Sequence, residues 1–174
     1  MPSPLGHVLG ALTVHLLTAR DRPERRAPMR AVVITGAALL PDIDLAFKLI
    51  DGRNHHQAET HSIGAALLAG LLVACVAAWR RADAPWRWGV LAALGWLSHI
   101  VLDYLGRDTH PPIGLLALWP FSAGYYKFPW PIFLDVGRTL DLATMGHNLV
   151  AVAWEAVVLL PIAAILWRRR LPEG

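Results

Sequence analysis

The sequence predicts an all-α, polytopic membrane bundle with about five transmembrane helices, forming a single integral-membrane domain over residues 1–174. Apolar residues make up 55% of the chain and charged residues 17%, whereas soluble domains contain fewer apolar and more charged residues. The mean hydropathy of +0.42 and the eight tryptophans favour the same class. The third observation is a series of five apolar segments separated by short polar stretches.

The five segments differ in how well they fit a span of about 20 residues. The first is short, Pro41 interrupts the second, and Ser62 is placed to cap the third. Residues 106–147 contain many glycines, prolines and aromatic residues, so we expect loops and short interfacial or re-entrant helices there. The predicted spanning helices are residues 4–19, 31–50, 62–79, 86–105 and 147–167.

Arginine clusters predict the orientation in a bacterial inner membrane. Residues 20–30, 80–87 and 168–170 hold eleven of the sixteen basic residues, and five spans would place all three clusters on one side. By the positive-inside rule that side is cytoplasmic. The protein is therefore expected to be multi-pass, with the loops at 51–61 and 106–147 facing the periplasm.

The remaining composition excludes some classes of partner. The net charge of +3 comes from loop arginines rather than from a continuous basic stripe, so we expect no nucleic-acid partner. The single Cys75 excludes an intramolecular disulfide and a CxxC zinc site. The oligomeric state is left open.

Histidines and carboxylates interrupt the apolar segments at a similar depth. Most of them lie 12 to 16 residues from the nearest arginine of a cluster, and His61 lies nineteen residues away. At a helical rise of 1.5 Å per residue, this places most of them roughly 18–24 Å from the arginines. The sequence thus predicts one polar layer near the outer face, made of His7, Asp42, Asp44, His61, His99, Asp103 and Glu155.

This layer has the composition of a divalent metal site. His99 and Asp103 are four residues apart, so they share one face of a helix. Imidazole and carboxylate ligands suit zinc first, with manganese or iron as alternatives. Seven candidate ligands exceed one tetrahedral shell, so one or two ions are expected. A dication would also offset the cost of burying the carboxylates.

Several motifs carry a resemblance to a known family. Leu40-Pro41-Asp42-Ile43-Asp44, Thr60-His61-Ser62 and the stretch Gly95 to Asp103 resemble the YdjM-type inner-membrane metal-dependent hydrolases. Leu5-Gly6-His7 looks like the opening helix of that family. Residues 118–122 look like its downstream Pro-Phe-Ser segment, and Glu155 falls where the family tends to place an acid.

A more distant similarity suggests the reaction. The zinc-dependent phospholipase C and single-strand nuclease group has the order His, Asp, His and His-xxx-Asp, which His7, Asp44, His61, His99 and Asp103 follow. This similarity implies phosphoester hydrolysis by clustered zinc. We therefore expect a membrane-embedded, phospholipase-like hydrolase that acts on a phospholipid or an isoprenoid phosphate at the outer face.

The hypothesis gives individual residues a role. Asp42 or Asp44 would orient the attacking water as a base, and His56 would protonate the leaving group. The phosphate of the substrate would be held by Arg53, Arg107 or Lys127.

Two other functions fit the same polar residues. The layer could belong to a small ion or proton transporter, or it could be a structural metal site in a non-catalytic membrane protein. A transporter should show polar residues over the full membrane depth, whereas these residues form one layer, which favours a site. We expect structural roles for His15 and His147 and a loop position for His110.

Overall fold

The computed structural model describes residues 1–52, 56–139, 141–169 and 171–173, and these described residues are helical with no β-strand. Asp21 and Asp141 cap α2 and α7 through their side chains, and Ser62 caps α5 as predicted, accepting a hydrogen bond from the Ala65 amide at 3.0 Å. The helices are α1 (Pro4–Thr18), α2 (Arg22–Arg26), α3 (Pro28–Leu39), η1 (Leu40–Ile43), α4 (Asp44–Asp51), η2 (Glu59–His61), α5 (Ile63–Trp79), α6 (Pro85–Tyr104) and α7 (Leu142–Arg168).

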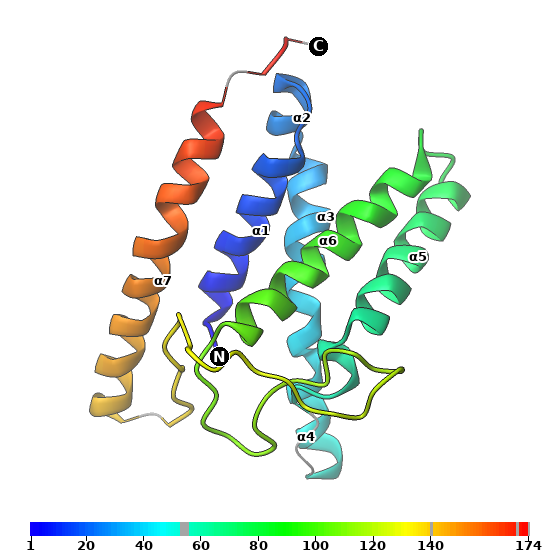
Figure 1. Ribbon diagram of the computed structural model, residues 1–174. Helices are drawn as coiled ribbons and strands as arrows, with labels where there is room; N and C mark the ends of the chain where they lie inside the picture. The colour runs from blue at the N-terminus through cyan, green and yellow to red at the C-terminus, as the bar shows by residue number, and fades with distance from the viewer. Residues whose placement is uncertain (53–55, 140, 170, 174) are drawn as a thin grey trace.

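Helices α1, α3 and α6 form the centre of the molecule (Figure 1). Helix α7 packs beside α1, and α5 packs along α6. The N-terminus and the long α6–α7 connection lie at one end, whereas α2 and the C-terminus lie at the other end (Figure 1).

The prediction of about five transmembrane helices is wrong. In the described residues one helix, α7, is long and apolar enough to cross a membrane. Helices α1 and α5 are apolar but contain 15 and 17 residues, fewer than the approximately 20 that a span requires. Helix α6 has 20 residues, but Arg87, His99 and Asp103 lower its hydropathy.

The predicted helix over residues 31–50 is also divided. Helix α3 ends at Leu39, a 3₁₀ turn follows, and α4 starts at Asp44. Pro41 explains the break, because it lacks an amide donor and disfavours helical geometry in the preceding residue. The turn places Asp42 and Asp44 where α3 ends.

In its described residues, the α6–α7 connection does not contain the expected short helices. The described residues 106–139 form an extended loop with isolated β-bridges, in which Leu115 and Tyr126 exchange two backbone hydrogen bonds of 2.9 Å. The loop is tied to the adjacent connection by the Leu116 amide, which donates to the Gln57 carbonyl at 3.0 Å. It therefore covers the end of the helices where the site lies.

Close helix packing sets the position of the site. A Cβ atom at Gly95 would lie 2.4 Å from the Ile34 carbonyl oxygen, so glycine is needed for α6 to approach α3 this closely. Gly10 likewise brings α1 against Leu102 of α6. These contacts hold the three central helices together on both sides of His99, at Gly95 before it and at Leu102 after it.

Candidate metal centre

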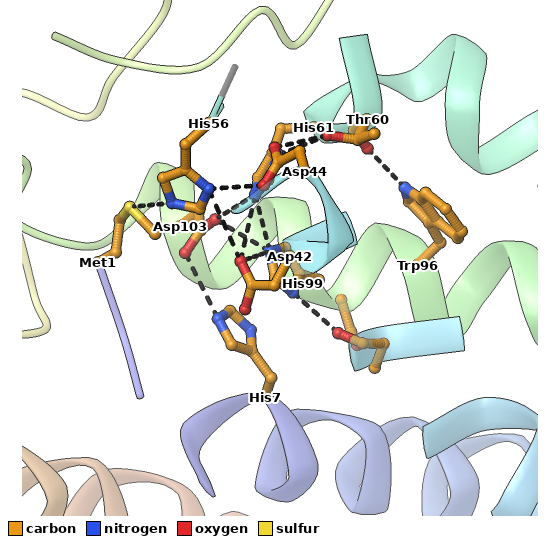
Figure 2. A network of polar contacts seen from close by, with 12 residues as sticks. Met1, His7, Asp42, Asp44, His56, Thr60, His61, Trp96, His99 and Asp103 are labelled. Atoms are coloured by element: carbon orange, nitrogen blue, oxygen red, sulfur yellow. Dashed lines mark hydrogen bonds and ion pairs between the residues drawn. The ribbon is translucent and has the colours of Figure 1, made fainter. Parts of the chain in front are cut away.

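Histidine and aspartate side chains from separate elements converge at the loop-covered end of the central helices (Figure 2). The helices α1 and α6 supply His7, His99 and Asp103, and the two 3₁₀ turns supply Asp42 and His61. His7, His61 and His99 are fully buried, and the Asp103 side chain is inaccessible to solvent. Five residues that the sequence placed in one layer are therefore neighbours in space.

The atoms of four of these residues are spaced as tetrahedral ligands. The His61 and His99 Nε2 atoms are 3.1 Å apart, and they lie 3.3 and 3.1 Å from Asp103 Oδ2. Asp42 Oδ1 lies 3.7 Å from both Nε2 atoms. Ligands at zinc distances of 2.0–2.2 Å on a tetrahedron are separated by about 3.3–3.6 Å. One zinc-sized ion thus fits these four atoms with small adjustments.

His7 extends the cluster on the other side of Asp103. Its Nε2 atom is 3.5 Å from Asp103 Oδ1, and its ring stacks on His99 with a centroid distance of 3.7 Å. Asp103 therefore offers one oxygen to His61 and His99 and the other oxygen to His7. A carboxylate in this position can bridge two cations.

Unsatisfied polar atoms support a cation in this cluster. In the described part of the chain, both ring nitrogens of His7, Oδ1 of Asp42 and both carboxylate oxygens of Asp103 are buried without a hydrogen bond. Buried polar atoms are normally hydrogen-bonded, and an uncompensated buried carboxylate is costly. A metal ion would satisfy these lone pairs together, so the donor set fits a divalent ion.

The histidines are oriented by contacts on their outer sides. His99 Nδ1 donates to the Ala38 carbonyl at 2.8 Å, and His61 Nδ1 lies 3.1 Å from Asp44 Oδ2. With the Nδ1 protons held there, the Nε2 lone pairs of both rings face the cluster. Such outer contacts fix the tautomer of metal-binding histidines.

Asp44, predicted as a ligand or a base, orients other residues in the structure. Its carboxylate accepts from His56 Nδ1 at 2.9 Å and from the Thr60 hydroxyl at 2.8 Å, in addition to His61. Burial alone would raise the pKa of Asp44, but the hydrogen bonds from His56 and His61 hold it well below its usual range. Asp44 is therefore a carboxylate that holds two rings in place.

The carboxylates favour positive charge at the centre of the cluster. Burial lowers the pKa of His61, but attraction to the nearby carboxylates of Asp103, Asp42 and Asp44 outweighs it and raises that pKa well above the usual value. The same field would stabilise a metal dication.

Thr60 and Trp96 also position the site, although no role was predicted for them from the sequence. The Trp96 indole donates to the Thr60 carbonyl at 2.8 Å, and the Thr60 hydroxyl donates to Asp44. A signal was available, because Thr60 directly precedes His61 and Trp96 lies one helical turn before His99.

Glu155 is placed differently from the prediction. Both of its oxygens accept hydrogen bonds from Ser3, one of them from the Ser3 amide at 2.6 Å. Ser3 is the N-cap of α1, so Glu155 anchors the start of α1 to α7. It is not among the residues that converge on the cluster.

The predicted phosphate-binding residues lie outside the cluster. Arg107 and Lys127 are exposed on the covering loop. The Arg107 amide donates to the Phe133 carbonyl at 2.9 Å. Arg53 lies outside the described residues.

The remaining histidines lie outside the group of proposed ligands. His15 contacts the Arg25 carbonyl at 2.9 Å, His147 contacts the Asp135 carbonyl at 2.7 Å, and His110 is exposed in the loop. His56 joins the cluster through Asp44, and its Nε2 atom contacts Met1 Sδ at 2.9 Å.

Over the described residues, the fold and the cluster define an all-helical protein with a buried histidine–aspartate site and one candidate membrane span. A comparison with protein-family models identifies it further. Residues 1–171 match the YdjM inner membrane protein family, and the chain belongs to that family. It is therefore an inner-membrane protein. No curated protein and no solved structure matches the chain.

Proposed function

We propose that the chain is a membrane-bound, metal-dependent hydrolase that cleaves a phosphoester of a lipid. The observation that carries this proposal is the convergence of His61, His99, Asp42 and Asp103 at near-tetrahedral spacing, with oxygens of both aspartates buried without a hydrogen bond. Catalytic zinc sites combine three protein ligands with a water, so three of these residues would hold the ion and leave a position for the attacking water.

These residues would hold a divalent metal, with zinc preferred and manganese or iron as alternatives. When bound, such an ion lowers the pKa of its water to about 7 and polarises a phosphoryl oxygen. His7, with the second oxygen of Asp103, supplies donors for a second ion. Asp42 is the most open of the ligands, with 23% of its side chain exposed, and it is placed to orient the attacking water.

His56 is the proton donor for the leaving group in this proposal. Asp44 holds its Nδ1 atom, so Nε2 is the atom that transfers the proton. Because Nε2 contacts Met1 Sδ, the substrate must displace the Met1 side chain. Arg107 and Lys127, on the loop over this end, supply charge for the phosphate.

An apolar pocket beside the cluster supports a lipid substrate. It has a volume of about 440 Å³ and includes Thr60, Leu68, Leu72, Trp96 and Trp119 in its lining. Thr60 is hydrogen-bonded to Asp44, so the pocket starts next to the site. Its walls suit the hydrocarbon chain of a phospholipid or an isoprenoid phosphate.

The distribution of arginines gives the orientation that we propose. Arg168 lies at the end of α7, the candidate span, and the Leu142 end of this helix lies on the side of the covering loop (Figure 1). With the arginine end in the cytoplasm, the cluster faces the periplasmic side.

Hydrolysis by the purified full-length protein tests the proposal. We expect release of phosphate-containing product from phospholipid or a generic phosphodiester, loss of this activity with a chelator, and recovery with zinc. His99→Ala should abolish activity, whereas the control His110→Ala on the exposed loop should retain it. Chelator-insensitive hydrolysis, or ion flux in liposomes without hydrolysis, would contradict the proposal.

A further inference from the structure

The opposite end of the molecule contains a second pocket with a different character. It has a volume of about 210 Å³ and lies where the C-terminal end of α1 meets the starts of α3 and α6. Three arginines line it, namely Arg20, Arg30 and Arg87, and Trp86 and Leu91 contribute apolar walls. His99 is 12 residues along α6 from Arg87, so this pocket is about 18 Å from the candidate metal centre.

The arginines carry more positive charge than their partner neutralises. Glu24 accepts hydrogen bonds from the Arg87 guanidinium and from the Arg20 amide, the latter at 3.0 Å, and it lies 3.5 Å from Arg30 Nη1. Within the described chain no carboxylate lines the pocket itself, because Glu24 and Asp83 face the neighbouring pocket of about 190 Å³.

Arg30 is the least expected of these residues. It is 5% exposed, and its Nε atom is buried without a hydrogen bond in the described residues. Burying a guanidinium is costly unless its donors are satisfied. The terminal nitrogens have partners, since Nη2 donates to the Thr18 hydroxyl and Nη1 lies 3.5 Å from Glu24. An anion in the pocket would add an acceptor for this incompletely satisfied guanidinium.

We propose that this pocket binds a phosphate group, through Arg20, Arg30 and Arg87. The planar guanidinium fork matches the oxygens of a phosphate, which a compact ammonium group does not. The apolar wall and the 60% exposed Trp86 suit a phosphate that carries a glycerol or hydrocarbon part, as in an anionic phospholipid. A free phosphate would use the same arginines. This site is independent of the proposed hydrolysis.

Calorimetric titration of the purified full-length protein tests the site. The two probes are inorganic phosphate and short-chain phosphatidylglycerol below its micelle concentration. Binding of both, or of the lipid alone, identifies a phospholipid headgroup as the ligand, and binding of phosphate alone identifies a soluble source. Either result supports the site, provided that binding of the probe weakens when an arginine of the pocket is replaced.

The variant Arg20→Gln tests whether binding depends on the arginines. It should leave the fold intact, because Arg20 contacts Glu24 through its backbone amide. We expect about tenfold weaker binding, the effect of losing one charge-assisted contact. The control Arg26→Gln removes the same charge from an exposed position at this end and should bind like the wild type. Absence of binding by either probe, or equal affinity of both variants, would overturn the proposal.

Discussion

The role of Asp44 can be separated from that of a metal ligand by the variant Asp44→Asn. Asp44 accepts hydrogen bonds from His56 Nδ1 at 2.9 Å, Thr60 Oγ1 at 2.8 Å and His61 Nδ1 at 3.1 Å. Asparagine keeps the shape but has one acceptor oxygen, so its amide group must face an N–H of either His56 or His61. Loss of such an orienting contact weakens metal affinity by about 10–100-fold, or about 1.4–2.7 kcal/mol.

Competition with a fluorescent zinc chelator measures this loss in the purified protein. His99→Gln, which removes a ligand, should lose more affinity than Asp44→Asn. The control Asp135→Asn changes a carboxylate of the covering loop and should bind zinc like the wild type. Equal zinc affinity of Asp44→Asn and the wild type would refute the orienting role. A loss of zinc affinity as large as that of His99→Gln would instead identify Asp44 as a metal ligand.

Two further predictions concern stability. Gly6→Ala would place a Cβ atom 2.7 Å from Glu155 Oε2, so we expect destabilisation of about 1–3 kcal/mol. The control Gly36→Ala meets no atom within 4 Å and should stabilise α3 by up to about 1 kcal/mol. Burial raises the pKa of Glu24, but hydrogen bonds from arginines hold it below 4.5. Glu24 therefore stabilises the fold above that pH, and this contribution is lost as the pH falls through its folded-state pKa.

Thermal unfolding in detergent checks both predictions. A Gly6→Ala protein as stable as the wild type would show that the Glu155 carboxylate moves away at no cost. For the second prediction, Glu24→Gln should lower the melting temperature at pH 7, and the difference from the wild type should shrink as the pH falls below 4.5. A difference that is independent of pH would contradict the ion-pair role.

The convergence of the site residues could be predicted from the sequence, because a helix rises by a fixed distance per residue. Counting from the arginines placed His7, His99 and Asp103 at a common level and His61 somewhat higher, and the structure brings them into contact. Such a count gives the depth of a residue along its helix, but not the direction in which its side chain points around the helix axis. Glu155 has the predicted level but faces Ser3.

The number of spans was not predictable from apolar composition, because hydropathy does not show where a helix ends. Pro41 ends α3 early, and the same turn separates the functions of Asp42 and Asp44, which are two residues apart. Asp42 faces the histidine nitrogens, whereas Asp44 faces their outer sides. The directions of the Asp42 and Asp44 side chains depend on the 3₁₀ turn and on Thr60. Neither of these produces a periodic pattern in the sequence.

Anomalous diffraction from crystals of the active protein, collected above and below the zinc edge, shows whether a metal ion occupies the histidine–aspartate cluster. We expect a peak among His61 Nε2, His99 Nε2, Asp103 Oδ2 and Asp42 Oδ1, about 2.0–2.2 Å from at least three of these atoms. Manganese and iron edges are the alternatives. The peak should be absent from His99→Ala crystals. An active protein with no transition-metal peak among these four residues would contradict the account.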